Sequence, residues 1–242
     1  HLIRNQLDET LSTSLLEKLN LPSRMNALFD VHQPNDTKSL IRAQKRLKFE
    51  EFFFFQFHLL KLKLIRNKKL KGYSFSILGK VFNDFYSNHL PFELTGAQKR
   101  VLKEIRSDVR DHNQMNRLLQ GDVGSGKTLV ALLSMLMAVD NNYQACLMAP
   151  TEILARQHFH SISEYLEKMD VNVAILTGSS TSKERKILYQ QLDDGKIDLL
   201  VGTHALIEDK VKFRNLGLVV IDEQHRFGVT QRAKLWKKNK YP

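Results

Sequence analysis

The sequence is poor in cysteine, the residue that forms disulfides and supplies reactive thiols. Cys146 is its only cysteine, so an intrachain disulfide is excluded and a reducing compartment fits. The apolar run around it, Ala145 to Ala149, favours a small buried residue over a nucleophile. The sequence also lacks internal repeats and low-complexity tracts.

No apolar run is long enough to span a bilayer. The longest, Leu129 to Val139, has eleven residues and contains Ser134, whereas a transmembrane helix needs about 20. The start shows no cleavable signal pattern, and it begins at His1 rather than Met, which suggests a fragment or a processed form. We therefore expect a cytoplasmic protein without a membrane partner.

Acidic residues are outnumbered by basic ones. The chain carries 37 Lys and Arg against 26 Asp and Glu, a formal net charge of +11, and its sequence pI is near 9.7. This balance favours a polyanionic partner, most simply nucleic acid, although a soluble basic surface is the alternative. Residues 1–91 hold 15 bases and 8 acids, and the remainder holds 22 and 18, so the excess is concentrated in the first part.

From Phe92 onward, short apolar runs alternate with segments of helical periodicity. This pattern predicts an α/β fold with a parallel sheet covered on both faces. Ligands of such sheets bind beyond the carboxyl ends of the strands, so the residues that follow each strand are the first candidates for function. The predicted strands are Met115–Leu119, Gln144–Ala149, Val173–Thr177, Asp198–Gly202 and Leu218–Asp222, and the predicted helices are 97–111, 127–139, 152–168 and 182–194.

Residues 1–91 are predicted to be mainly helical. A short helix should run from Leu11 to Leu19 and stop before Pro22, and a third helical pattern runs from Ile77 to His89. Between them, Asp36 is a suitable N-cap for a long helix that continues to about Arg66, since no Pro or Gly interrupts it.

The long predicted helix has two unusual stretches. Residues 52–55 are four consecutive phenylalanines, which we expect to pack against two neighbours at once; base stacking is the alternative. Residues 61–71 carry six bases and no acid, which suits a solvated helix end and a nucleic-acid contact equally well.

A complete phosphate-binding loop lies between a predicted strand and a predicted helix, the context that this motif requires. Its glycines allow the backbone to turn tightly and direct N–H groups at phosphate oxygens, and the helix N-terminus adds positive potential. Lys127 should reach the β- and γ-phosphates of a nucleoside triphosphate, and the Thr128 hydroxyl should ligate Mg²⁺. The loop consists of Gly121, Asp122, Val123, Gly124, Ser125, Gly126, Lys127 and Thr128.

Two adjacent carboxylates follow the last predicted strand, at Asp222 and Glu223. Because the strand delivers them to the ligand-binding edge of the sheet, Asp222 should hold Mg²⁺ through water and complement Thr128. Glu223 is then placed to orient and deprotonate the attacking water. With Lys127, these two residues form the predicted catalytic set, and His225 is the neighbour expected to couple with them.

The loop and the sequence Asp222-Glu223-Gln224-His225 resemble the first motor domain of superfamily 2 helicases. Within that superfamily the chain is similar to the RecG family of ATP-dependent DNA helicases, which remodel forks and branched DNA. The resemblance covers essentially the whole chain. It implies a RecA-like, parallel-sheet P-loop NTPase domain at 92–242 that uses ATP and Mg²⁺. Residues 1–91 would be a helical linker joining a wedge domain to this motor.

The resemblance assigns further roles by motif. In the segment Phe92-Glu93-Leu94-Thr95-Gly96-Ala97-Gln98, Gln98 would bond the adenine edge and Phe92 would stack beside it. Segments after three predicted strands match motifs that grip DNA, and they supply Thr151, Arg156, Gly178, Thr203 and His204. The stretch after Asp222 supplies His225, Gln231 and Arg232 as coupling residues. The partner would be forked or branched duplex DNA, the protein a monomer, and the compartment the bacterial cytoplasm, at the nucleoid.

The physical chemistry of these loops agrees with a DNA partner. Hydroxyl and N–H groups at strand-to-helix junctions suit sugar-phosphate oxygens, which carry no sequence information. Binding should therefore be independent of sequence and weakened by salt. For Thr151, helix capping is the competing role and is compatible with DNA contact.

Two alternatives remain from the sequence. The transcription-coupled repair translocase has similar motor motifs, but Gln224, where that relative would have Glu, favours RecG, as do leader segments such as Arg46 to Glu51. A nucleotide-gated DNA-binding module is the other, although it would not need Glu223. No second motor domain with arginine fingers, worth about 10³ to 10⁵ in rate, precedes Pro242, so we expect these 242 residues alone to hydrolyse ATP poorly.

Overall fold

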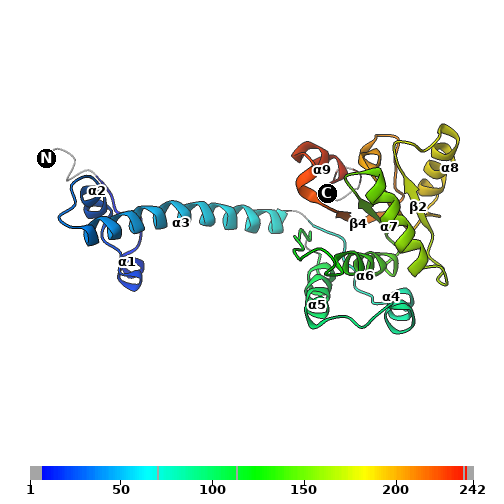
Figure 1. The fold of residues 1–242 in the computed structure, drawn as a ribbon, viewed down its shortest axis with the longest axis horizontal. Coiled ribbons are helices and arrows are strands. Elements are labelled where there is room, and N and C mark those ends of the chain that lie inside the picture. Colours follow the sequence, from blue (N-terminus) through cyan, green and yellow to red (C-terminus); the bar gives the residue numbers. More distant parts are fainter. Residues whose placement is uncertain (1–6, 70, 113, 237, 239–242) are drawn as a thin grey trace. The chain divides into compact units, whose positions relative to one another are not determined.

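The computed structural model describes residues 7–69, 71–112, 114–236 and 238, and it divides into two compact units, His1–Arg66 and Asn67–Pro242 (Figure 1). The first unit is helical, and the second contains the sheet. None of the helices within the described ranges is both long and apolar enough to cross a membrane.

Three helices build the first unit: α1 (Thr13–Leu19), α2 (Arg24–His32) and α3 (Thr37–Lys69). The predicted helices at α1 and α3 are confirmed. Asp36 caps α3 as expected, because its Oδ1 accepts a hydrogen bond from the Ser39 N–H at 2.6 Å. Helix α2 was not predicted, although Ser23 marks its start by accepting a bond from the Asn26 N–H at 3.3 Å.

A buried arginine joins separate segments of the first unit. The side chain of Arg46, on α3, is fully buried and contacts the carboxylates of Glu9 at 2.6 Å and Glu50 at 2.5 Å. Glu50 also accepts a hydrogen bond from the Thr10 hydroxyl at 2.7 Å. A buried charge is costly unless it is paired, so Arg46 depends on these two carboxylates. The same bonds join the segment before α1 to the first half of α3.

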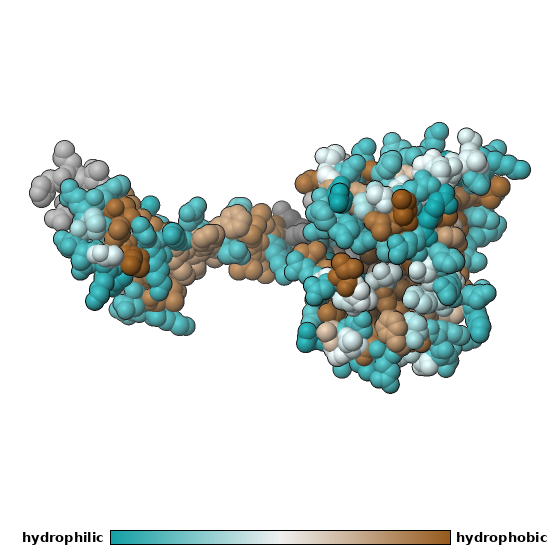
Figure 2. Space-filling model, in the orientation of Figure 1, coloured by the Kyte–Doolittle hydropathy of each residue, from teal (hydrophilic) through white to brown (hydrophobic). Residues whose placement is uncertain are grey.

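The aromatic stretch of α3 does not pack as expected. Phe52 and Phe55 are 65% and 58% exposed, and Figure 2 shows hydrophobic surface along this helix. Phe53 stacks only along its own helix, on Phe49 and Phe57, with ring centroids 5.8 and 6.3 Å apart. The bonds that join α1 and its neighbours to α3 reach only as far as Glu50, so the expectation of two packing neighbours is wrong for the described part of this unit.

The second unit contains a four-stranded parallel sheet in the order β2–β3–β1–β4. The strands are β1 (Gln144–Met148), β2 (Val173–Leu176), β3 (Leu199–Gly202) and β4 (Leu216–Ile221). In the register, Leu147 of β1 lies between Val201 of β3 and Val220 of β4. The predicted parallel α/β architecture is confirmed, and four of the five predicted strands are present.

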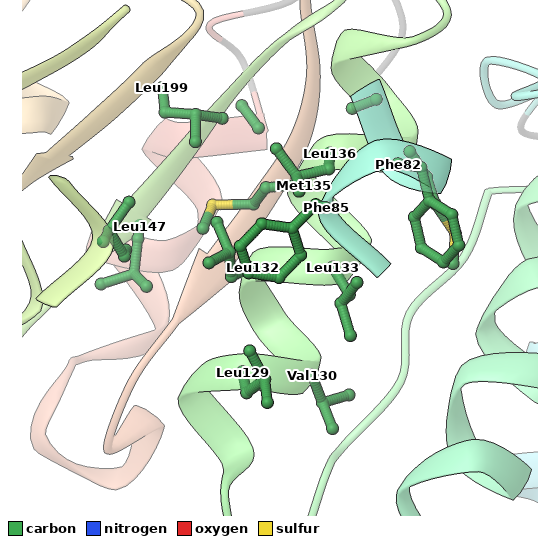
Figure 3. Close-up of a cluster of buried hydrophobic side chains, with 14 of the residues drawn as sticks. Phe82, Phe85, Leu129, Val130, Leu132, Leu133, Met135, Leu136, Leu147 and Leu199 are labelled. Carbon is green, nitrogen blue, oxygen red and sulfur yellow. The ribbon is translucent and has the colours of Figure 1, made fainter. Parts of the chain in front are cut away.

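Helices surround this sheet. They are α4 (Lys80–Asp84), α5 (Gly96–Arg110), α6 (Lys127–Val139), α7 (Glu152–Tyr165), α8 (Ser182–Asp193) and α9 (Val229–Trp236), with a π-helical turn η1 (Phe85–His89) and 3₁₀ turns η2 (His204–Ile207) and η3 (Gln224–Arg226). Helix α6 is central: Leu132, Leu133, Met135 and Leu136 are fully buried, because α4, α5 and β1 all pack against it (Figure 3). Cys146 is also fully buried, which raises the pKa of its thiol to about 12 and confirms a packing role.

Residues Met115–Leu119, predicted as the strand before the phosphate-binding loop, are not a strand in the structure. Arg117 instead pairs with Glu104 at 2.5 Å and Asp108 at 2.6 Å, both on α5. Met115 and Leu119 contact the core, but the intervening side chains are exposed. The ion pairs therefore hold this segment against a helix, and β4 is the edge of the described sheet.

The second unit begins before the boundary expected at residue 92. Phe82 and Phe85 enter its core against α6 (Figure 3). Asp140, at the end of α6, accepts hydrogen bonds from the backbone N–H groups of Gly79, Val81 and Phe82 at 2.8 to 3.0 Å. The compact division therefore falls at 66/67, whereas a division of function at residue 92 stays a prediction.

We predict that Asp140→Ala destabilises the second unit. The change leaves three N–H groups at the start of α4 without their acceptor, so the free energy of unfolding should fall by about 1 to 3 kcal/mol. Urea denaturation followed by circular dichroism measures this. Asp193→Ala, which removes an exposed acid at the end of α8, is the control and should change stability by less than about 0.5 kcal/mol. Equal stability of the two variants would contradict the assignment.

Candidate active site

The phosphate-binding loop is exposed and closely folded. Gly124 and Gly126 have φ of +81° and +76°, a backbone conformation that side chains disfavour. A Cβ on Gly126 would also lie 2.3 Å from Gln98 Nε2, and one on Gly121 would lie 2.7 Å from Ser125 Oγ. The positive φ values therefore favour glycine at 124 and 126, whereas Gln98 and Ser125 could move to relieve the close contacts. Asp122 and Val123 are exposed at the outer turn, which leaves the loop open to a ligand.

Lys127 is the first residue of α6, and its side chain bonds back to the loop. Its Nζ donates hydrogen bonds to the carbonyl oxygens of Gly121 and Asp122, each at 2.8 Å. A cation held by two neutral acceptors at a helix N-terminus is available to an anionic ligand, because a phosphate oxygen competes well with a carbonyl. Thr128 follows it in the first turn of α6 and is half-buried. The residues present therefore fit a triphosphate and its metal ion.

Asp222 lies directly after β4, where its N–H donates to the carbonyl of Met148 at 2.9 Å. Its Oδ2 is 2.8 Å from His158 Nε2, and its Oδ1 accepts from the Glu223 N–H at 3.0 Å. The hydrogen bond from His158 is the main cause that lowers the pKa of Asp222, and the charge of Lys127 lowers it further. Asp222 is therefore ionised and lies within electrostatic reach of Lys127.

Glu223 occupies a strained backbone position. Its φ of +47° is in the left-handed region, which non-glycine residues seldom adopt. The side chain is exposed and its Oε2 lies 3.3 Å from His225 Nδ1. The pair Asp222 and Glu223 thus presents one anchored and one exposed carboxylate at the same sheet edge. His225 contacts the predicted catalytic base, and its coupling role stays a prediction.

Gln98 contacts the phosphate-binding loop. It closes a capping box at the start of α5, where its Oε1 accepts from the Thr95 N–H at 2.8 Å. Its Nε2 donates to the carbonyl of Ser125 at 3.0 Å. One N–H and one acceptor lone pair remain for another ligand. Phe92 precedes the same helix and is exposed, so its ring is accessible.

The loops after β1 and β2 are joined to each other. Thr151 caps α7, since its hydroxyl accepts from the Leu154 N–H at 3.3 Å. Arg156 binds Glu152 at 2.8 Å and the Ser179 hydroxyl at 3.0 Å, so the start of α7 holds the loop that contains Gly178. Gly178 is exposed, and a Cβ there would meet open space, so the surrounding structure does not itself require glycine.

The loop after β3 places its two predicted contact residues differently. His204 is exposed, but Thr203 is buried, and its hydroxyl has no hydrogen-bond partner among the described residues. A direct DNA contact by this hydroxyl would therefore need local opening. Arg185 joins the loops after β2 and β3, because it donates to the Thr177 carbonyl at 2.8 Å and pairs with Glu208 at 3.0 Å.

The remaining coupling residues follow the Asp222 segment. Gln231, in α9, accepts a hydrogen bond from the Gly228 N–H at 3.1 Å and so stabilises the start of that helix. Arg232 belongs to α9, but its side chain lies outside the described residues. The roles of both in coupling stay predictions.

Two residues of this edge were not identified as functional from the sequence. His158 lies about two turns after Thr151, and its helical spacing from Leu154 and Ala155 places it on the buried face of α7. A histidine on the buried face of the helix was the available sign of a packing or bonding role, although nothing in the sequence indicates that His158 contacts Asp222. Arg185 had no signal, because its partners come from two separate loops.

Comparison with known proteins agrees with this geometry. The model of the DEAD/DEAH box helicase family matches residues 95–240. Proteins named ATP-dependent DNA helicase RecG are 44% identical in Synechocystis (over 98% of this chain and 28% of theirs), 45% in Bacillus subtilis (98% and 35%) and 48% in Aquifex aeolicus (94% and 30%). This chain thus spans about a third of these relatives.

A solved structure of RecG bound to a three-way DNA junction superposes with a TM-score of 0.78 at 44% identity, over 92% of this chain and 30% of that one. The chain belongs to the DEAD/DEAH box helicase family, and the resemblance to RecG predicted from its motifs is confirmed.

Proposed function

We propose that this chain is the first motor domain, with its preceding linker, of a helicase that uses ATP to remodel forked and branched DNA. The observation that carries the proposal is the convergence of Lys127 and Asp222 on one edge of the sheet, with Glu223 beside them. The RecG relatives and the structure with a three-way junction support the DNA substrate. Roles in recombination and repair, and a place in the bacterial cytoplasm at the nucleoid, belong to the same proposal.

Each residue of the site has a defined task in this proposal. Lys127 exchanges its carbonyl partners for the β- and γ-phosphates, and the loop N–H groups hold the remaining phosphate oxygens. Thr128 and Asp222 would hold Mg²⁺, which would supply charge neutralisation at the phosphates. Glu223 orients the attacking water and accepts its proton. His225 contacts Glu223 and is the first residue to sense that change.

Adenine selection is assigned to Gln98 and Phe92. The unused N–H and lone pair of the Gln98 amide match the donor and acceptor on the adenine edge. Since the same amide bonds Ser125, its position is fixed by the loop that holds the phosphates. Phe92 offers an exposed ring for stacking.

DNA binding is assigned to the loops after the first three strands. Thr151, Gly178, Thr203 and His204 follow these strands and Arg156 lies near the start of α7. Their hydroxyl, N–H and guanidinium groups suit the sugar-phosphate backbone, although the buried Thr203 hydroxyl needs local opening to take part. The affinity should not depend on sequence and should fall with salt. The monomeric state and the slow hydrolysis expected of these 242 residues alone stay predictions.

We predict that Lys127→Ala in the full-length protein abolishes ATP-dependent unwinding of forked DNA. Loss of the cation that binds the phosphates should lower kcat/KM for ATP by about 100-fold or more. DNA binding, measured by fluorescence anisotropy, should change little because the DNA loops keep their own bonds. Lys196→Ala, at the opposite end of the sheet, is the matched control and should behave like the wild type. Unwinding by Lys127→Ala at the wild-type rate would exclude this motor mechanism.

Glu223→Gln separates the motor from the nucleotide-gated binding module. The substitution keeps the shape of the side chain but removes the proton acceptor, so ATP should still bind while hydrolysis falls by about 100-fold or more. A gated module needs only binding and would keep its function. Unwinding assays and nucleotide binding by calorimetry distinguish the two. Retained unwinding would favour the gated module and overturn the role of Glu223.

A further inference from the structure

Helix α7 contacts both the proposed DNA-binding edge and the proposed metal-binding carboxylate. Its first turn carries Glu152, whose Oε1 accepts hydrogen bonds from the Ser179 hydroxyl and from Arg156 at 2.8 Å. Further along α7, His158 Nε2 lies 2.8 Å from Asp222 Oδ2. One element therefore joins the loop after β2 to the carboxylate after β4.

The His158 contact fixes the orientation of Asp222. The two side chains are 15% and 30% exposed, so the bond is partly shielded from water. Of the two hydrogen bonds that the carboxylate accepts within the described residues, the one from the Glu223 N–H comes from the adjoining residue. The other bond comes from His158, on α7, which is a different element. A carboxylate oxygen accepts hydrogen bonds, so at this distance the His158 ring is assigned as the donor through Nε2.

The helix between the two contacts is continuous. α7 runs without interruption from Glu152 to Tyr165, and Glu152 and His158 are separated by about 9 Å along its axis. Ala155 and Ile162 are fully buried on either side of His158, which anchors the helix on the sheet. A displacement of the first turn is thus carried to His158 rather than absorbed by a flexible loop.

We propose that His158 is a positioning residue that couples DNA contact at the start of α7 to the orientation of Asp222. This inference rests on the proposed motor function. DNA at Thr151, Arg156 and the Gly178 loop shifts the first turn, and the shift moves the N–H that holds the carboxylate. His158 itself touches neither DNA nor nucleotide. The expected consequence is that DNA accelerates hydrolysis through this hydrogen bond.

The test measures ATP hydrolysis by the full-length protein with and without a forked duplex. In His158→Ala the DNA-stimulated kcat should fall by about tenfold or more, the range seen when a group that orients a metal ligand is lost. The kcat without DNA should also fall, because Asp222 loses a hydrogen bond in both states, but by a clearly smaller factor, so that the ratio of the two rates falls. The Kd for the fork should not change, because the DNA loops are intact.

Three further variants make the result specific. His158→Gln should recover most of the stimulation, since its Nε2–H can donate at a similar reach. Ser179→Ala cuts the link between the Gly178 loop and α7 and should lower the same ratio, which keeps the test available if His158→Ala fails to fold. His160→Ala, an exposed histidine on the same helix, should leave the ratio unchanged.

The outcomes are distinguishable. An equal loss of both rates in His158→Ala would show a local effect on the metal site and overturn the coupling. Unchanged rates in His158→Ala would overturn it as well. A wild-type protein that shows no DNA-stimulated hydrolysis would contradict the proposed function itself, and the coupling with it.

Discussion

The arrangement of this site depends on the parallel sheet, which brings the Asp222 carboxylate and the Lys127 ammonium to the same edge. The two residues are distant in the chain, and they meet because β4 ends beside β1 while α6 packs on β1. The hydrogen bond from His158 keeps the carboxylate charged, and the lysine charge adds to this effect. Lys127 is held by two backbone carbonyls and Asp222 by His158 and the Glu223 N–H, so each charge has its own anchor.

Local sequence determined much of the second unit. Helix α6 was predicted with its observed bounds, because the loop glycines define its start and its apolar residues are buried against three elements. The four paired strands are short apolar runs bounded by polar residues, which sequence patterns identify well. The segment Met115–Leu119 has the same appearance, but Arg117 lies in its middle and binds acids on α5. Long-range ion pairs of this kind cannot be inferred from a local pattern.

In the candidate site too, local sequence predicts some features and tertiary packing determines others. The loop residues, Asp222 and Glu223 follow from motif spacing, since their chemistry depends on local backbone geometry. The bonds that orient them do not: His158 meets Asp222, and Gln98 meets Ser125, only through tertiary packing. Thr203 is the opposite case, because its motif position suggests an accessible hydroxyl and the fold buries it. The motifs therefore indicate which residues act, and the packing determines what holds them.

Two arginines near the proposed DNA-binding loops are paired with acids in the structure. Arg156 binds Glu152 and Ser179, and Arg185 binds Glu208. A phosphate that recruits Arg156 must therefore compete with a carboxylate, and the released Glu152 alters the bonds of the first turn of α7. Exposed ion pairs contribute only about 0 to 1 kcal/mol, so this exchange is energetically accessible. Contact with DNA would thus change the same helix that holds Asp222, which gives a sequence-independent partner a direct physical route to the nucleotide.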